Sequence, residues 1–318
     1  MEKRNVLIDC DPGVDDVMAL LLALANQDRL NILGVTTVSG NQTLAKVTRN
    51  LRKLLTFLRI EIPAACGASK PLIKDPLHGG EIHGETGLDG WDFPPPVFQL
   101  ETDNGIVFLK EKIMEAGGKV TLVPTGPLTN IGLLFSVFPE TKERIELISL
   151  MGGSIFSGNR TPFAEFNIYA DPEAAKIVFD SGIPIVMSGL EVTNKAAIND
   201  EEINGLINSE GPVSRMAGNL LQNYTNFHRS KGRTTYPLHD VVSVMYLLKP
   251  EIFEGRDYRV EIDTSAGGYR GRTAADTGEL MRHDPPNAHV LMDVDRDRFM
   301  GRFFEALKRL DESVNKEQ

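Results

Sequence analysis

The sequence predicts an α/β protein in which helices flank a mainly parallel, Rossmann-like central sheet, with the active site at the C-terminal ends of the strands. Three observations support this fold class. Short apolar, β-branched segments alternate with helical segments along the chain. Polar residues, glycine and proline directly follow several strand ends, where such folds keep their ligand sites. No repeat or linker divides the 318 residues, so residues 1–318 are expected to form a single domain.

The first strand leads directly into an acidic corner. Apolar residues 6–8 favour a strand, Pro12 and Gly13 end it, and residues 17–24 predict a helix with a wide apolar face. Four carboxylates lie in the corner, on Asp9, Asp11, Asp15 and Asp16. The last two fall in the first helical turn, where the helix dipole favours negative charge.

The acidic corner favours a metal site. A single acid at a helix start is ordinarily a cap, and this is the alternative for each residue of the pair Asp15 and Asp16 taken alone. Four acids so close together repel one another unless a cation or protons neutralise them. Hard oxygen ligands suit Mg²⁺ or Ca²⁺ better than zinc, and the spacing is not that of an EF-hand loop.

The remaining elements follow in regular order. Residues 32–38 form a β-branched strand that ends at Ser39-Gly40-Asn41, and Asn41 taken alone is ordinarily a turn residue. Further strands are predicted near residues 62–66, 120–124, 145–151, 183–187, 258–263, 269–273 and 288–292. Helices are predicted near residues 44–58, 104–116, 200–229, 241–248 and 297–310, and another opens at Asp171-Pro172 with Asp171 as its cap.

Two histidines stand where acid–base chemistry is possible. His83 lies in the long Gly- and Pro-rich stretch 67–103, and loops of this length inside a domain are often functional. A loop histidine is usually only solvated, so composition alone favours the structural interpretation of His83. His239 stands beside Asp240 at a predicted helix start, and such a pair in isolation is also commonly structural.

Polar side chains also gather after two later strands. Thr125 follows the strand 120–124 in a Gly-Pro turn, which can expose a backbone carbonyl to the crevice at the strand ends. Asn159, Glu165 and Asn167 lie among apolar residues and must find partners in the protein or in a ligand. Amides and carboxylates suit a polyhydroxyl ligand, with capping as the alternative for each residue alone.

Composition limits the class of partner. The formal net charge of −10 argues against nucleic acid, which requires a basic surface. No apolar run approaches the roughly 20 residues of a membrane helix, and the N-terminus leads directly into a strand, without space for a signal peptide. Cys10 and Cys66 form no CxxC pattern, which is typical of free thiols in the cytoplasm.

Taken together, the ordered motifs resemble those of the nucleoside hydrolases, the inosine-uridine preferring group and its pyrimidine-preferring relatives. The matching blocks are Asp9-Cys10-Asp11-Pro12-Gly13-Val14-Asp15-Asp16, Ser39-Gly40-Asn41, Pro124-Thr125-Gly126-Pro127-Leu128-Thr129-Asn130, Met151-Gly152-Gly153, Ala164-Glu165-Phe166-Asn167, Asp171-Pro172-Glu173-Ala174-Ala175 and Leu238-His239-Asp240. A lone Asp-x-Asp pattern is weak, but so many blocks in order over most of the chain are specific.

The resemblance implies an enzyme that hydrolyses ribonucleosides to ribose and free base, and it also implies a homo-oligomer, a tetramer or a dimer. The implied metal is Ca²⁺, held by Asp11, Asp16, the Thr125 carbonyl and Asp240, with Asp9 behind them. Asp11 would also take a proton from a Ca²⁺-bound water. The implied ribose contacts are Asp15, Asn41, Asn159, Glu165 and Asn167, with Met151 lining the site.

The resemblance leaves the base preference open between pyrimidines (uridine and cytidine) and a broad inosine-uridine range. His239 is similar to the histidine near the departing base, and His83 matches a loop histidine of the relatives. The sequence around His83 looks most like the pyrimidine group. However, the Gln and Tyr that mark pyrimidine-preferring members are replaced by Phe227 and Lys231.

Two other classes of protein are compatible with part of this pattern. A haloacid-dehalogenase-type phosphatase also has Asp-x-Asp after its first strand, with Asp9 as nucleophile, but it gives the later Asn and Glu residues no role. A non-catalytic nucleoside-binding protein on the same scaffold is the other. The presence of every expected metal ligand and of His239 favours an enzyme.

Overall fold

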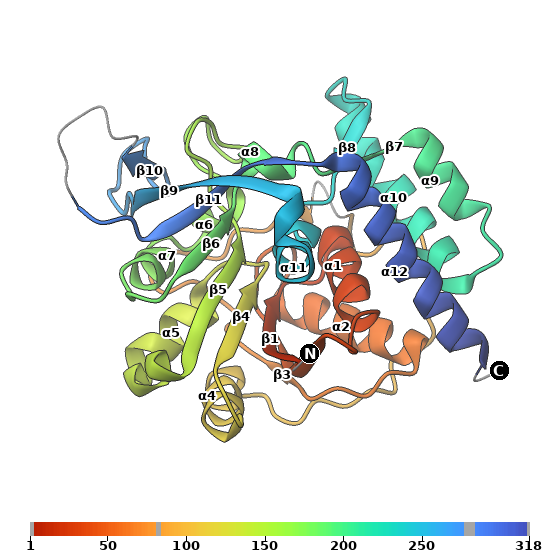
Figure 1. The fold of residues 1–318 in the computed structure, drawn as a ribbon, viewed down its shortest axis with the longest axis horizontal. Coiled ribbons are helices and arrows are strands. Elements are labelled where there is room, and N and C mark those ends of the chain that lie inside the picture. The colour runs from red at the N-terminus through yellow and green to blue at the C-terminus, as the bar shows by residue number, and fades with distance from the viewer. Residues whose placement is uncertain (1–2, 81–83, 277–283, 317–318) are drawn as a thin grey trace.

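The computed structural model describes residues 3–80, 84–276 and 284–316, and its centre is a nine-stranded sheet (Figure 1). The strand order is β10-β9-β11-β6-β5-β4-β1-β2-β3. The seven strands from β11 to β3 pair in parallel, and β9 and β10 add an antiparallel edge. The strands are β1 Arg4–Cys10, β2 Leu30–Thr37, β3 Ala64–Cys66, β4 Val120–Pro124, β5 Ile145–Met151, β6 Ile185–Ser188, β9 Phe253–Ile262, β10 Thr273–Asp276 and β11 Ala288–Val294, with β7 Ala197–Asn199 and β8 Thr235–Pro237 forming a separate pair. The predicted α/β class is confirmed.

Helices cover both faces of the sheet, as a parallel sheet requires (Figure 1). Helices α1, α2, α10, α11 and α12 belong to one apolar core, and α4, α5 and α7 belong to the other. The helices are α1 Val14–Leu24, α2 Leu44–Leu58, α4 Gly105–Glu115, α5 Thr129–Val137, α6 Phe166–Ala170, α7 Pro172–Phe179, α8 Leu190–Thr193, α9 Asp200–Ile207, α10 Pro212–Ser230, α11 Val241–Leu248 and α12 Arg296–Lys316.

Most predicted boundaries agree with the structure, and the largest difference lies at the antiparallel edge. The hairpin predicted over 258–263 and 269–273 is formed instead by β9 and β10, with Thr273 opposite Ile262. Residues 269–272 belong to the turn, where Gly271 has φ +78°. The single helical region predicted near 200–229 is two helices, divided before Pro212, which takes the first position of α10.

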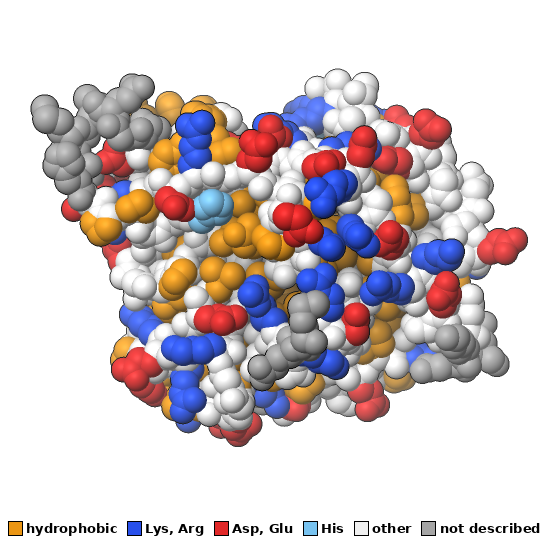
Figure 2. All heavy atoms as spheres, in the orientation of Figure 1, with side chains coloured by type: hydrophobic (Ala, Val, Ile, Leu, Met, Phe, Trp, Pro, Cys, Tyr) orange, Lys and Arg blue, Asp and Glu red, His pale blue; other side chains and the backbone are white. Residues whose placement is uncertain are grey.

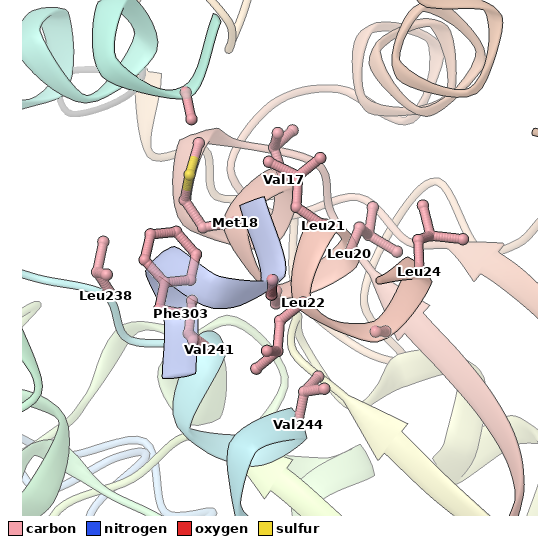
Figure 3. Packing of buried hydrophobic residues seen from close by; sticks show 14 of the residues in the cluster. Val17, Met18, Leu20, Leu21, Leu22, Leu24, Leu238, Val241, Val244 and Phe303 are labelled. Carbon is pink, nitrogen blue, oxygen red and sulfur yellow. The ribbon is translucent and has the colours of Figure 1, made fainter. Parts of the chain in front are cut away.

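Helix α1 is buried along its whole length, and this burial holds the acidic corner inside the protein. Every residue from Val14 to Leu24 is buried. Figure 3 shows Met18 near Phe303 of α12 and Leu22 pointing toward Val244 of α11. A helix that is apolar on all sides belongs in the core, so the carboxylates at its N-terminus are also withdrawn from water.

The surface carries both signs of charge. On the face drawn in Figure 2, acidic and basic side chains are interspersed around small apolar areas. In the described part of the chain, no helix combines the length and apolar character needed to cross a membrane.

Candidate active site

The acidic corner lies where β1, β2 and β4 end, as expected for the C-terminal edge of a parallel sheet. The carboxylate of Asp16 is its most extensively hydrogen-bonded group. Its Oδ1 accepts from the backbone N–H of Asp11 (3.2 Å) and from Thr125 Oγ1 (2.8 Å). Its Oδ2 accepts from the N–H of Gly13 (3.1 Å) and from Asn41 Nδ2 (3.0 Å). Asp16 therefore ties together the ends of three strands.

Asp11 is held more loosely and keeps one oxygen available. Its Oδ2 accepts from the Asn41 N–H at 2.5 Å, whereas its buried Oδ1 has no hydrogen-bond partner among the described residues. Gly40 and Gly126 leave room for this carboxylate. A Cβ atom at Gly40 would lie 2.1 Å from Oδ2, and a Cβ atom at Gly126 would lie 2.6 Å from Oδ1. Burial, reinforced by the neighbouring Asp16, raises the pKa of Asp11 well above its ordinary value.

Asp9 lies behind the other carboxylates. Burial raises the pKa of Asp9 to about 7, although hydrogen bonds from Thr36 Oγ1 (2.5 Å) and Asn130 Nδ2 (2.7 Å) oppose the shift. Asn130 also donates to the carbonyl of Thr37 and accepts from the N–H of Ala68. In the sequence, Asn130 stands out only as the last residue of the motif Pro124-Thr125-Gly126-Pro127-Leu128-Thr129-Asn130, which predicts no role for it.

Three buried carboxylates could hold a metal ion. Oxygens of Asp15, Asp16 and Asp240 all lie within 4.8 Å of one another. Burial is the main cause that raises the pKa of Asp240 well above its ordinary value, and nearby aspartates add to it. Hard oxygen donors with the same charge in one buried space fit a divalent cation of the Mg²⁺ or Ca²⁺ type. This group contains Asp15, which the family resemblance assigns to ribose, and it does not include Asp11.

The opposite wall carries the later polar residues. Glu165 caps α6, and its carboxylate accepts from the backbone N–H groups of Gly153, Asn167 and Ile168 at 2.9–3.2 Å. Burial raises the pKa of Glu165, and these hydrogen bonds oppose the shift. The Nδ2 of Asn167 donates to the carbonyls of Thr125 (2.7 Å) and Met151 (3.2 Å). The capping interpretation is therefore correct for Glu165, alongside its place in the cavity.

The exposed residue Asn159 completes this wall. Its Oδ1 accepts from the N–H of Phe166 at 2.9 Å, which fixes the loop leading into α6. A cavity of about 450 Å³ opens between this wall and α10. Nine of the predicted residues line the cavity: Asp15, Asn41, Thr125, Met151, Asn159, Glu165, Asn167, His239 and Asp240.

Several lining residues were not predicted as site residues. They are His78, Phe166, Leu190, Asn194, Tyr224, Phe227, His228, Lys231 and Arg233, with Arg160 at the same opening. The rings of Tyr224 and His228 lie 4.7 Å apart on α10. No local pattern distinguishes a cavity-facing helical position from a core position, although Phe227 and Lys231 differ from the residues of the pyrimidine-preferring members. His83 lies outside the described residues.

His239 is the acid–base candidate nearest the carboxylates. It directly precedes Asp240 at the start of α11, and its Nδ1 lies 2.8 Å from the hydroxyl Oγ1 of Thr193 at the end of α8. Thr193 is fully buried and was not predicted. His239 also lines the cavity, so its ring lies where a ligand would bind.

The site is a buried carboxylate cluster beside amide side chains at one cavity, an arrangement suited to a divalent cation and a hydroxyl-rich ligand. Residues 6–301 match the family model described as inosine-uridine preferring nucleoside hydrolase. The chain is 46% identical over 307 residues to the pyrimidine-specific ribonucleoside hydrolase RihA of Shewanella sp. (strain MR-7), covering 96% of both chains. It is 42% identical to the RihA of Escherichia coli O7:K1, covering 95% of this chain and 98% of the relative.

Solved structures agree with the sequence comparisons. The purine-preferring ribonucleoside hydrolase from Gardnerella vaginalis superposes with a TM-score of 0.89 at 27% identity, covering 98% of this chain and 99% of that one. The chain therefore belongs to the inosine-uridine preferring nucleoside hydrolase family and hydrolyses the N-glycosidic bond of ribonucleosides. This activity is the predicted one, and it replaces the phosphatase and the non-catalytic binding protein as interpretations.

Proposed function

We propose that the chain prefers pyrimidine ribonucleosides, uridine and cytidine, over purine ribonucleosides. The proposal rests on a difference in sequence identity. The chain is 46% identical over nearly its whole length to a relative named as pyrimidine-specific, but only 27% identical to the solved purine-preferring enzyme. The test is kcat/KM for uridine, cytidine, inosine and adenosine. We expect the two pyrimidines to exceed the purines by at least about tenfold. Equal values, or higher values for inosine, would contradict the pyrimidine preference and leave a broad specificity.

We infer that Ca²⁺ is the cofactor, held by Asp11, Asp16, the carbonyl of Thr125 and Asp240. Two of these residues, Asp16 and Asp240, belong to the converging carboxylate group, and Asp15 adds a third carboxylate. The Oδ1 of Asp11, which has no partner among residues 3–80, 84–276 and 284–316, is a further buried oxygen of this corner. When bound, Ca²⁺ supplies an acidified water and neutralises the repulsion between the carboxylates.

Asp11 acts as the base in this proposal. Its Oδ1 has no hydrogen-bond partner within the described part of the chain and can accept a proton, while the Asn41 N–H holds Oδ2 in place. Asp9, Asn130 and Thr36 keep this part of the corner in place from behind.

The ribose is gripped by side chains from both walls, namely Asp15, Asn41, Asn159, Glu165 and Asn167, with Met151 against it. All six line the cavity. Breaking the N-glycosidic bond develops positive charge on the ribose, and buried carboxylates stabilise that charge as it forms. Hydroxyl recognition by buried polar groups also disfavours 2′-deoxyribonucleosides, which would leave some of these groups unpaired.

His239 is proposed to assist departure of the base, with Thr193 orienting the ring. Substituting His239→Ala is expected to lower kcat for uridine by about 10²-fold, since protonation of a poor leaving group contributes rate of this order. The same variant should change the rate for p-nitrophenyl riboside less than about threefold, because that leaving group departs without protonation. Steady-state kinetics on the two substrates check this. An equal loss on both would assign His239 to the ribose or the metal instead.

The quaternary structure and location remain predictions. We infer a homo-oligomer, a dimer or a tetramer, in the cytoplasm, from the family resemblance and the free thiols of Cys10 and Cys66. That residues 1–318 form a single domain, and that His83 contacts the substrate, are likewise predictions.

A further inference from the structure

Three side chains on and just before α2 hold one loop. Lys46 and Asn50 are four residues apart on the helix and face the same side, and Gln42 lies just before the helix begins at Leu44. Each donates its side-chain N–H to a backbone carbonyl of the loop. The acceptors are three consecutive residues, Gly84, Glu85 and Thr86, at 2.8, 2.5 and 2.9 Å respectively.

The loop itself is compact. The carboxylate of Asp89 accepts from the N–H groups of Glu85 (2.8 Å) and Thr86 (3.3 Å) and from the Thr86 hydroxyl (2.5 Å). These bonds let residues 84–90 dock on α2 as a unit. The docking bonds of residues 84–86 run from side chains to backbone carbonyls and are partly exposed, so this stretch can open locally, whereas Leu88 is buried in the apolar core and keeps the loop attached to the domain.

Asn50 connects this loop to the acidic corner. The residue is only 2% exposed, and its Nδ2 donates both to the Thr86 carbonyl (2.9 Å) and to the Pro12 carbonyl (3.0 Å). The Pro12 carbonyl and the Gly13 N–H belong to the same peptide unit, and this N–H donates to Asp16 Oδ2 (3.1 Å). Thus one amide group fixes both the loop and the peptide plane that holds Asp16.

We propose that Asn50 is a positioning residue that couples docking of the loop 84–90 to metal binding at Asp16. The proposal rests on the inferred Ca²⁺ site. A docked loop keeps the Asn50 amide on Pro12, which in turn keeps Asp16 oriented toward the other carboxylates. Coupling between two events is reciprocal, so Ca²⁺ must strengthen loop docking by the same factor by which docking strengthens Ca²⁺ binding.

The test uses Asn50→Leu, which keeps the volume and removes the donors, and Lys46→Met, which removes a loop contact without touching the corner. Calorimetry with Ca²⁺ on chelator-treated full-length protein is expected to give affinity losses of about tenfold for Asn50→Leu and about threefold for Lys46→Met. The double variant should match Asn50→Leu within about twofold, because the loop acts on the metal through Asn50. Arg49→Met, an exposed change on the same helix, should leave the affinity unchanged.

Hydrogen exchange of the amides of residues 84–90 supplies the second readout. In the wild type, Ca²⁺ should slow their exchange, and in Asn50→Leu it should not. If Lys46→Met and Asn50→Leu effects multiply in the double variant, or if both variants bind Ca²⁺ like the wild type, the coupling is wrong. A wild-type protein that binds no Ca²⁺ would instead overturn the inferred metal site, and the coupling with it. Lys46 is only half-buried, so its variant tests the coupling even if Asn50→Leu folds poorly.

Discussion

Substituting Asp11→Asn is expected to lower kcat for uridine by about 10³-fold, the loss typical of a missing general base. Asn has nearly the same shape, so its side chain can still accept from the Asn41 N–H and fill the space left by Gly40 and Gly126. What it lacks is a basic oxygen at the position of Oδ1, the atom without a partner among the described residues. Steady-state kinetics with uridine measure the effect.

The matched control for this prediction is Asp75→Asn, which removes one carboxylate from an exposed position. It should retain the wild-type kcat. Both variants lose one negative charge, so the comparison removes any general effect of net charge. Circular dichroism and thermal melting of Asp11→Asn should show a folded protein. A folded Asp11→Asn enzyme with a tenth or more of the wild-type kcat would rule out Asp11 as the base.

Removing Ca²⁺ with a chelator is expected to lower the melting temperature, and restoring it to about a hundredfold excess over its Kd should raise the value by roughly 5 °C. The reason is electrostatic: oxygens of Asp15, Asp16 and Asp240 lie within 4.8 Å of one another in a buried space. Without a cation these groups must repel or take up protons, and both weaken the folded state.

Asp240→Asn separates this effect from nonspecific ion binding. The variant should lose most of the Ca²⁺-dependent rise in melting temperature, because one carboxylate ligand is gone. In the absence of Ca²⁺ it should melt at or above the wild-type temperature, since it removes one of three repelling charges. A full Ca²⁺ response in Asp240→Asn, measured by differential scanning calorimetry, would place the ion elsewhere.

Much of the fold was predictable because its signals are local. The helix predicted over 44–58 and the strands over 120–124 and 145–151 agree with α2, β4 and β5 to the residue. The antiparallel edge was less predictable, because the pairing of β9 with both β10 and β11 depends on register between distant segments. Short elements such as α6, α8 and β7 are too brief to produce a periodic pattern.

The site was predictable where polar residues follow strand ends and less so elsewhere. Asp11, Asp16 and Asn41 stand out as polar residues in apolar surroundings, and they do meet in space. Asn50 and Thr193 give no such signal, because a polar residue on a helix is ordinarily solvent-exposed. Their burial and their contacts with Pro12 and His239 arise only from the packing of α2 and α8 against the corner.

The most direct test of a metal-dependent nucleoside hydrolase is release of free ribose from uridine by the purified protein, with chelator and after Ca²⁺ is restored. We expect ribose release in Ca²⁺, loss of at least about 10²-fold with chelator, and recovery on adding Ca²⁺ back. A phosphate ester such as p-nitrophenyl phosphate should remain intact throughout. Unchanged ribose release in chelator would contradict the metal-centred mechanism, and release of phosphate without ribose would contradict the glycosidic reaction itself.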